Sequence, residues 1–151
     1  MVALFDSYAG TSIQRNGGAL YEKGYSGNVG FSLSSGALYD IGAYVTTSHG
    51  YSFGNGLWMG GGIGLLWPLE DVPSLPLFVE SRYTFYMDKV NPFVACKIGV
   101  VLWHSDDSLG YFSPSFGIEY DRWSFFVSYD SMSSLTNTVK TTNLGFSWKF
   151  N

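Results

Sequence analysis

Residues 77–87 alternate between two kinds of side chain, and this alternation constrains the fold more than any other feature of the sequence. The odd positions carry Leu, Val, Ser, Tyr, Phe and Met, whereas the even positions include Glu80, Arg82 and Thr84. Successive side chains of a β-strand point to opposite faces, so one face of this segment is apolar and the other is polar and charged. The class of fold depends on which of these two faces points inward.

Eight segments of the chain show strand-like alternation of this kind. They are residues 23–34, 38–53, 57–67, 77–87, 92–103, 110–120, 123–130 and 141–150. Turn-forming or polar stretches separate them. The sequence therefore predicts an all-β domain at residues 23–151. A periplasmic lead-in is expected at residues 1–22, in which residues 10–12 and 16–18 are interpreted as loop.

The connections between the predicted strands are of two kinds. Those after the second, fourth and sixth strands are tight turns at residues 54–56, 88–91 and 121–122. Those after the third, fifth and seventh strands are longer and more polar, although the connection after the first strand is short and departs from this rule. Short turns at one rim and long loops at the other are typical of outer-membrane barrels. The pattern favours an eight-stranded antiparallel up-and-down β-barrel.

The polar face of these strands is unlike the surface of a soluble protein. Charged residues make up 13% of the chain, whereas soluble surfaces usually carry roughly a quarter to a third. The polar face is rich in Gly, Ser, Asn and Thr, and the apolar face is continuous and aromatic. We therefore expect a transmembrane barrel with an apolar exterior and a filled polar interior. The alternative is a soluble ligand-binding barrel of the lipocalin or avidin type, with its apolar face inside.

Aromatic residues lie near the ends of the predicted strands on the apolar face. Trp and Tyr are enriched at both interfaces of a membrane, so these residues are expected to form two girdles. If both termini are periplasmic, the outer girdle consists of Tyr39, Trp67 and Trp103, and the inner girdle includes Tyr120, Trp123, Trp148 and Phe150.

Composition and charge argue against several other classes of protein. The net charge is −4 and no run of Lys or Arg appears, so nucleic-acid binding is not expected. Cys96 is the single cysteine, which excludes an internal disulfide and a cysteine-rich metal site. No cofactor is expected, and no window approaches the roughly 18 apolar residues of a membrane helix. No signal peptide follows Met1, so we expect a mature chain from which the signal has been removed.

Several short stretches together resemble a known group of proteins. Residues 23–27, 49–51, 60–64, 76–85, 92–99, 112–117 and 144–150 look like small outer-membrane β-barrel proteins of the Bacteroidetes type. The architecture is similar to the eight-stranded OmpA and OmpX barrels. The resemblance implies a place in the outer membrane, contact with its lipid, and insertion by the barrel-assembly machinery. It implies no common activity.

Four charged residues fall on the polar faces of three consecutive predicted strands. They are Glu80, Arg82, Lys97 and Glu119. Three further charged residues extend the same polar set toward the rims, namely Asp40, Asp130 and Lys149. An eight-stranded barrel has an interior just wide enough for side chains, so we expect these two acids and two bases to neutralise each other in an interior polar network that stops conduction. A narrow polar pore or proton path is the alternative interpretation.

Two other features of the sequence are a polar loop and a proline within a predicted strand. Residues 104–107 place a histidine, a serine and two acids in one polar loop, but neighbours in an exposed loop rarely form the geometry of a catalytic triad, so no catalytic residue is assigned. Pro114 lies within the sixth predicted strand. Because proline cannot donate to the ladder, a bulge or a loose local pair is expected there.

The sequence thus predicts a non-enzymatic outer-membrane barrel with a structural or interaction role. In its finer form, the prediction is an accessory subunit of a larger envelope complex, with other outer-membrane proteins as partners. A narrow channel, a lipid-modifying outer-membrane enzyme and a soluble ligand-binding barrel are the alternatives.

Overall fold

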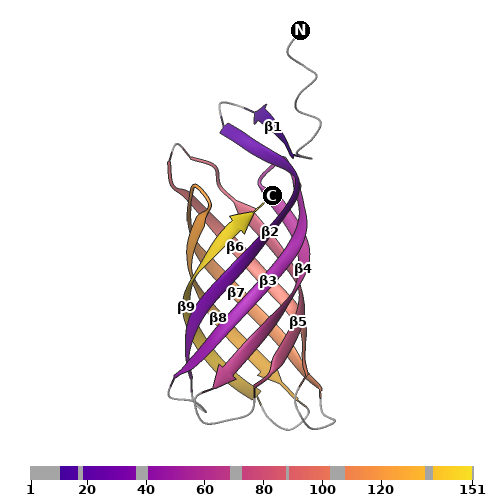
Figure 1. Ribbon diagram of the computed structural model, residues 1–151, viewed down its shortest axis with the longest axis vertical. Coiled ribbons are helices and arrows are strands. Elements are labelled where there is room, and N and C mark those ends of the chain that lie inside the picture. The colour runs from indigo at the N-terminus through magenta and orange to yellow at the C-terminus, as the bar shows by residue number, and fades with distance from the viewer. Residues whose placement is uncertain are drawn as a thin grey trace.

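The chain forms a closed β-barrel of tilted strands, in which the first described strand and the end of the last strand lie at the same end (Figure 1). The computed structural model describes residues 11–16, 19–36, 41–68, 73–87, 89–102, 108–134 and 138–150. Within these residues there are nine strands and no helix. The strands are β1 (Thr11–Asn16), β2 (Ala19–Gly36), β3 (Gly42–Phe53), β4 (Leu57–Pro68), β5 (Leu75–Thr84), β6 (Asn91–Leu102), β7 (Ser108–Tyr120), β8 (Trp123–Ser133) and β9 (Thr138–Phe150).

The barrel itself consists of the eight strands β2 to β9. Each strand pairs antiparallel with the next one along the chain, and β2 pairs with β9 to close the ring. The closing ladder runs from Gly27 opposite Phe150 to Gly36 opposite Thr141. We call the end that carries β1 and the end of β9 the terminal rim and the opposite end the loop rim. The predicted eight-stranded antiparallel up-and-down barrel is confirmed.

The first strand lies outside this ring and was missed by the sequence analysis. Residues 10–12 and 16–18 were interpreted as loop, yet Thr11–Asn16 is a strand that pairs with the beginning of β2. Strand β2 begins at Ala19 and runs through the predicted boundary between residues 22 and 23. The polar residues and glycines of this segment favour turns locally. In the structure, backbone pairing with β2 overrides that preference.

The remaining strands differ from the prediction by a few residues at their ends. Strand β5 ends at Thr84 rather than at residue 87, β8 extends to Ser133 rather than ending at residue 130, and β9 begins at Thr138 rather than at residue 141. Strand β3 begins at Gly42 rather than at residue 38, although residues 38–40 fall outside the described residues. Among the described residues there is no helix of the length and apolar character that crossing a membrane requires.

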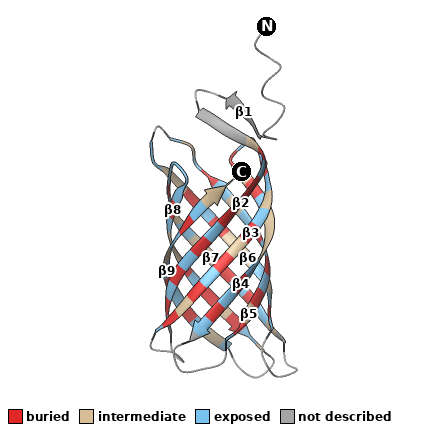
Figure 2. Cartoon of the chain, viewed as in Figure 1, coloured by how far each residue is buried: buried red, intermediate tan, exposed pale blue. Residues whose placement is uncertain are grey.

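The barrel is polar inside and apolar outside. Val79 and Leu144 are 65% and 69% exposed, whereas Glu80 is 2% exposed and Asn143 is completely buried. Along each wall strand, exposed and buried residues alternate (Figure 2). A soluble barrel would bury Val79 and its outward neighbours and expose the charged face, so the soluble alternative is wrong. The wall instead suits contact with hydrocarbon.

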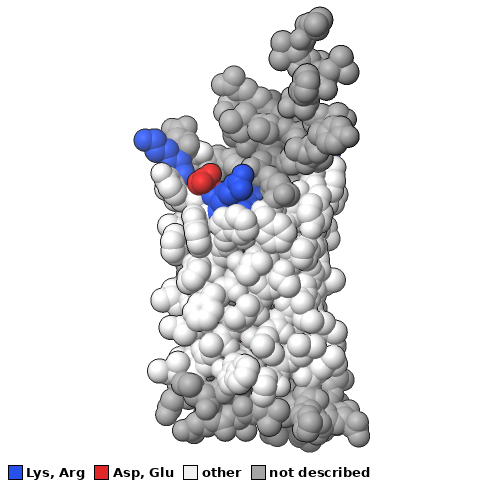
Figure 3. Space-filling view, viewed as in Figure 1, with Lys and Arg blue, Asp and Glu red and all other residues white. Residues whose placement is uncertain are grey.

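Charged side chains are rare on the barrel wall. In the face shown by Figure 3, the Lys, Arg, Asp and Glu side chains of the described residues gather at the terminal rim, and the wall below them carries none. A charge facing lipid near the middle of a bilayer costs about 2–4 kcal/mol for Lys or Arg. The distribution of charge therefore agrees with a wall that contacts lipid.

The ladder between β7 and β8 is interrupted at Pro114. Pairing runs from Gly110 to Phe112, stops, and resumes at Ser115 opposite Ser128. The register is the same on both sides of the gap, so the expected loose pair occurs without a bulge. On the outer wall, a shallow groove of about 230 Å³ lies at this gap, between Pro114 and Tyr129.

Candidate functional site

Charged, polar and aromatic side chains converge in the lumen of the barrel. The glycines of β4 leave the space that the largest of these side chains occupy. Those at positions 60, 62 and 64 face inward. A side chain added at Gly60, Gly62 or Gly64 would collide with the ring of Trp58, Phe78 or Tyr44, respectively. The glycine-rich face of this strand therefore makes room for three large rings, as the sequence pattern indicated.

Glu80 lies at the centre of the ionic part of the lumen. Its carboxylate is 3.2 Å from the guanidinium of Arg82 and accepts a hydrogen bond of 3.1 Å from the hydroxyl of Ser48. Lys97 lies directly opposite Glu80 in the ladder between β5 and β6, and its positive charge acts on that carboxylate as well. One buried acid is therefore shared by two cations and a hydroxyl.

Aromatic rings surround both of these cations. The guanidinium of Arg82 lies 4.4 Å from the centre of the Phe93 ring. The ammonium of Lys97 lies 4.9 Å from the centre of the Phe78 ring and 6.0 Å from that of Phe126. Such contacts are worth about 2 kcal/mol or more when they are desolvated. The rings therefore compensate part of the cost of taking Arg82 and Lys97 out of water.

Glu119, the fourth member of the predicted network, lies nearer the terminal rim. Its carboxylate is 3.9 Å from the ammonium of Lys149, a residue that the sequence pattern placed in the same polar set, toward the rim. Both border a cavity of about 20 Å³ that also touches Arg82 and Trp58, and Trp58 donates a hydrogen bond of 3.0 Å to Ser26. A cavity of that size holds about one water molecule. It is far too small for a substrate or an open pore.

Asp130 is a buried acid that the sequence pattern placed in the same polar set, beyond the four residues of the predicted network. It is 2% exposed and accepts hydrogen bonds from Ser113 at 2.6 Å, Tyr111 at 3.2 Å and Ser128 at 3.3 Å. The charge of Lys97 also acts on it. The charge of Lys97 thus acts on two acids, Glu80 and Asp130. Asp130 lies on the inward face of β8, as the alternation of polar and apolar residues in the predicted strand 123–130 indicated.

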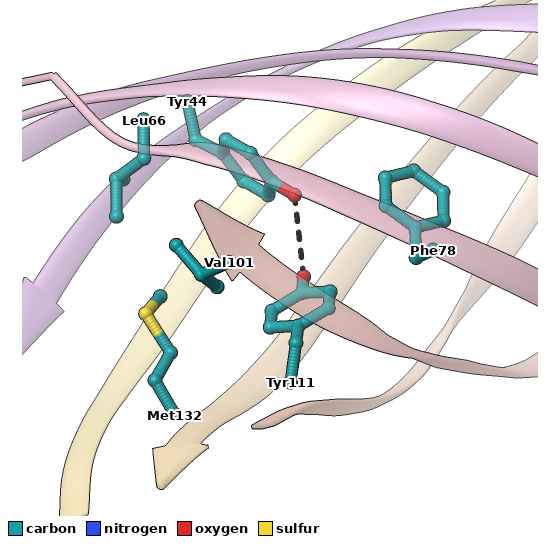
Figure 4. Packing of buried hydrophobic residues seen from close by; sticks show 6 residues of the cluster. All are labelled: Tyr44, Leu66, Phe78, Val101, Tyr111 and Met132. Carbon is teal, nitrogen blue, oxygen red and sulfur yellow. Dashed lines mark hydrogen bonds between the residues drawn. The ribbon is translucent and has the colours of Figure 1, made fainter. Parts of the chain in front are cut away.

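An apolar cluster closes the lumen toward the loop rim (Figure 4). Each member is at most 5% exposed, and Val101 is completely buried. The hydroxyls of Tyr44 and Tyr111 are 3.3 Å apart at its centre. We call this cluster the plug. It consists of Tyr44, Leu66, Phe78, Val101, Tyr111 and Met132. The sequence analysis missed the plug because its members occur singly on the inward faces of six strands.

The described members of the predicted aromatic girdles lie on the outer wall. Trp67 is exposed near the loop rim, and Tyr120, Trp123 and Trp148 are exposed near the terminal rim, where Phe150 is partly covered. The rings of Trp148 and Phe150 are 5.9 Å apart. Tyr39 and Trp103, the other two predicted members, fall outside the described residues.

One histidine also faces outward. The ring of His49 makes hydrogen bonds with the hydroxyls of Tyr25 and Thr47, and the centres of the His49 and Phe150 rings are 5.5 Å apart. Both ring nitrogens therefore have protein partners, so this polar group is satisfied on an otherwise apolar wall.

The described residues contain no group of three or more His, Cys, Asp or Glu side chains that could hold a metal ion. Cys96 is a free thiol, partly exposed on the outer wall. Asp40 and the polar loop at residues 104–107 fall outside the described residues.

Comparison with solved structures identifies the fold. Neisserial surface protein A aligns with a TM-score of 0.65 at 14% identity, over 83% of this chain and 94% of that protein. The N-terminal β-barrel domain of Pseudomonas aeruginosa OprF aligns with a TM-score of 0.57 at 14% identity, over 83% and 97%. A de novo designed transmembrane β-barrel aligns with a TM-score of 0.54 at 12% identity, over 92% and 100%.

No family model matches the sequence, and the search of curated proteins gave no match. The likeness to the solved structures concerns the fold, because the identities are between 12% and 14%. The chain therefore has the fold of an outer-membrane, transmembrane β-barrel, and its function has to be argued from its own residues.

Proposed function

We propose that this protein is a non-enzymatic barrel of the bacterial outer membrane that acts through interaction or structure rather than through transport. The observation that carries the proposal is the plug. Tyr44, Leu66 and Val101 belong to one apolar cluster inside the barrel and are each at most 5% exposed, so side chains fill the lumen at their level.

Placement in the outer membrane is supported by the polarity of the wall. Large apolar side chains are exposed on every strand from β2 to β9, and burying them in hydrocarbon removes an otherwise unfavourable contact with water. A closed barrel also leaves no open sheet edge in the ring, as a membrane demands. Outer-membrane lipid is thus the first partner, and the barrel-assembly machinery is the expected route of insertion.

The finer form of the proposal is that the barrel is an accessory subunit of a larger envelope complex and that other outer-membrane proteins are its partners. A plugged lumen leaves the rims and the outer wall as the surfaces available for function. The described turns at residues 54–56 and 121–122 are too short to form a binding platform. The Bacteroidetes-type resemblance of the sequence stays a prediction, since the three compared structures carry no such information.

The proposal is tested by conductance in planar lipid bilayers. The purified protein is expected to give no steady ion steps, whereas a Tyr44→Ala, Val101→Ala double variant, which removes part of the plug, is expected to give them. Phe146→Ala on the outer wall serves as the control and is expected to stay silent. Steady steps in the unmodified protein that disappear with Glu80→Ala would support a narrow channel instead. Mass spectrometry of envelope lipids, with and without the protein, tests the absence of a lipid-modifying activity.

A further inference from the structure

The interrupted ladder at Pro114 coincides with a groove on the outer wall of the barrel. The groove has a volume of about 230 Å³ and lies over β7 and β8, with one residue of β9 beside it. We call it the wall groove. Its lining includes Pro114 and Phe116 of β7, Val127 and Tyr129 of β8, and Thr142 of β9. It is a hollow in a surface that otherwise faces lipid.

The shape of the wall groove follows from the sizes of its side chains. Phe116 lies opposite Val127 in the ladder between β7 and β8. Pro114 comes opposite Tyr129 when the same register is continued through the gap, so in each pair a large ring faces a smaller side chain. Phe116 is 65% and Tyr129 is 44% exposed, whereas Val127 is partly covered. The two rings therefore border a floor of smaller side chains.

The surroundings of the wall groove are apolar on every strand that forms it. Phe112, Phe125 and Leu144 are exposed outward neighbours on β7, β8 and β9. A hollow with no atoms in it deprives its lining of dispersion contacts, and water gains little from so apolar a surface. The acyl chain of a membrane lipid is the apolar group that such a wall brings next to the hollow.

A lysine lies on the loop-rim side of the wall groove. Lys140 precedes Thr142 by two residues on the same outward face of β9, which is about 7 Å along the strand, and it is exposed. Among the described residues, no carboxylate lies within ion-pair distance of its ammonium. Strand β9 begins at Thr138, so this ammonium can reach the headgroup region instead of the middle of the bilayer, where a charge is costly.

The chemistry of the wall therefore changes in a fixed order from the wall groove toward the loop rim. Apolar side chains at Pro114 and Val127 come first, the hydroxyls of Tyr129 and Thr142 follow, and the ammonium of Lys140 comes last. A phospholipid presents an acyl chain, ester oxygens and a phosphate in the same order. The wall and the lipid thus match in polarity and in charge.

The size of the wall groove argues against a protein as its occupant. A stable interface between proteins buries roughly 800 Å² on each partner, whereas a groove of about 230 Å³ holds part of one narrow chain. A free phosphate ion would leave the apolar floor uncovered. A lipid fills the floor and brings an anion to Lys140 at the same time.

We propose that the wall groove binds one lipid with an anionic, phosphate-bearing headgroup. Its acyl chain lies on the floor at Pro114 and Val127, and its phosphate lies against the ammonium of Lys140, in the leaflet at the loop rim. This inference rests on the proposed placement of the barrel in a membrane and deepens it, because it names the class of lipid and the part of the wall that holds it.

Paramagnetic broadening of methyl signals in NMR spectra tests the position of the acyl chain. The protein is placed in phosphatidylcholine nanodiscs with a small fraction of phosphatidylglycerol that is spin-labelled on its acyl chain. The methyl signals of Val127 are expected to broaden more than those of Val79, although Val79 is the more exposed of the two, at 65%. With spin-labelled phosphatidylcholine, the broadening should follow exposure. Weaker or equal broadening at Val127 with the phosphatidylglycerol label overturns the proposal.

Native mass spectrometry tests the headgroup. The protein is equilibrated with equal amounts of phosphatidylglycerol and phosphatidylcholine of the same chain length, and the retained lipid is identified. A preference of about fivefold for phosphatidylglycerol is expected, the order of the effect of one lysine on an anionic lipid. Lys140→Gln should abolish this preference. Lys89→Gln, the same loss of charge in the exposed turn between β5 and β6, should keep it. Equal losses in the two variants, or no preference in the unmodified protein, overturn the proposal.

A second pair of variants changes the floor without changing any charge. Val127→Phe fills the wall groove, and Val79→Phe adds the same ring to the wall at β5. Only Val127→Phe is expected to lose the preference for phosphatidylglycerol. If Val127→Phe retains it while heat-modifiable migration shows a folded barrel, the groove does not hold the lipid.

The same measurements identify a different occupant. A species with twice the mass of the chain that disappears in Val127→Phe indicates a second copy of the barrel in the wall groove, and it overturns the proposal. Bilayer conductance is measured on all four variants. If they stay silent while the lipid preference is missing, the proposed function stands and only the lipid site is wrong.

Discussion

The two halves of the lumen are filled by different means. Toward the loop rim, the plug relies on apolar side chains such as Leu66 and Val101, which need no polar partner. Toward the terminal rim, Glu80, Arg82 and Lys97 form an ionic cluster in which each charge depends on the others. Removing one member of the apolar half leaves a cavity, whereas removing one member of the ionic half leaves an uncompensated charge. The ionic half should therefore be the more sensitive to single substitutions.

The largest expected effect comes from Glu80→Ala. Both Arg82 and Lys97 would lose their shared acid, and an uncompensated buried charge costs about 3–5 kcal/mol. The free energy of unfolding, measured by urea titration of barrels folded in lipid vesicles, should fall by this amount. Val79→Ala, the neighbouring residue on the outer wall, is the matched control and should cost clearly less. An equal loss of unfolding free energy for Glu80→Ala and Val79→Ala would show that the lumen is no more sensitive to substitution than the outer wall.

Leu66→Ala tests the apolar half. Truncation of a buried Leu typically costs about 2–5 kcal/mol, and we expect the lower part of this range because the plug is a small cluster of six side chains. Leu65→Ala, on the exposed face of the same strand, controls for a change in β4 itself. If Leu66→Ala lowers the free energy of unfolding by more than Glu80→Ala in the same urea titration, the apolar half of the lumen is the more sensitive to single substitutions.

Asp130→Asn tests the acid that connects the halves. Its carboxylate accepts from Ser113, Tyr111 and Ser128, and an amide group can accept on only one side, so at least one donor loses its partner. A loss of about 1–3 kcal/mol is expected. The companion variant Ser113→Ala removes one of the donors. If Asp130→Asn loses stability through that bond, the two changes together should cost less than their sum.

The smallest effect is expected for Tyr44→Phe, which removes one hydroxyl from the plug and keeps its ring. The lost contact with Tyr111 is a single neutral hydrogen bond at 3.3 Å, worth about 0.5–1.5 kcal/mol. Conductance should stay silent because the ring still fills the lumen. Ion steps in this variant would show that the hydroxyl pair, rather than apolar packing, closes the barrel.

The strands and the inside-out polarity followed from the sequence because both are local properties. The alternation around Glu80 and Arg82 already places these two side chains on one face, and a lipid-facing wall is readable from the low content of charge. The loose pair at Pro114 was also predictable from the sequence. Proline has no N–H to donate to the ladder, whichever residue it faces on the neighbouring strand.

What the sequence could not show depends on register across strands distant in the chain. Glu119 was grouped with Lys97 because their strands are adjacent, yet its ion pair is with Lys149 on β9. The plug likewise arises only when the eight strands close into a ring and bring single residues of six of them together. Strand β1 was missed for another reason: its pairing with β2 outweighs the local preference of its residues for loop.

The position of β1 has a practical consequence for work with this protein. Gly24 pairs with Ser52 on one edge and with Thr11 on the other, so β1 lies on the edge of β2 that β9 occupies further along. A purification tag or fluorescent fusion that continued the line of β9 beyond Phe150 would run into β1. Epitopes and reporters are therefore better inserted between β8 and β9, at the far end of the cylinder.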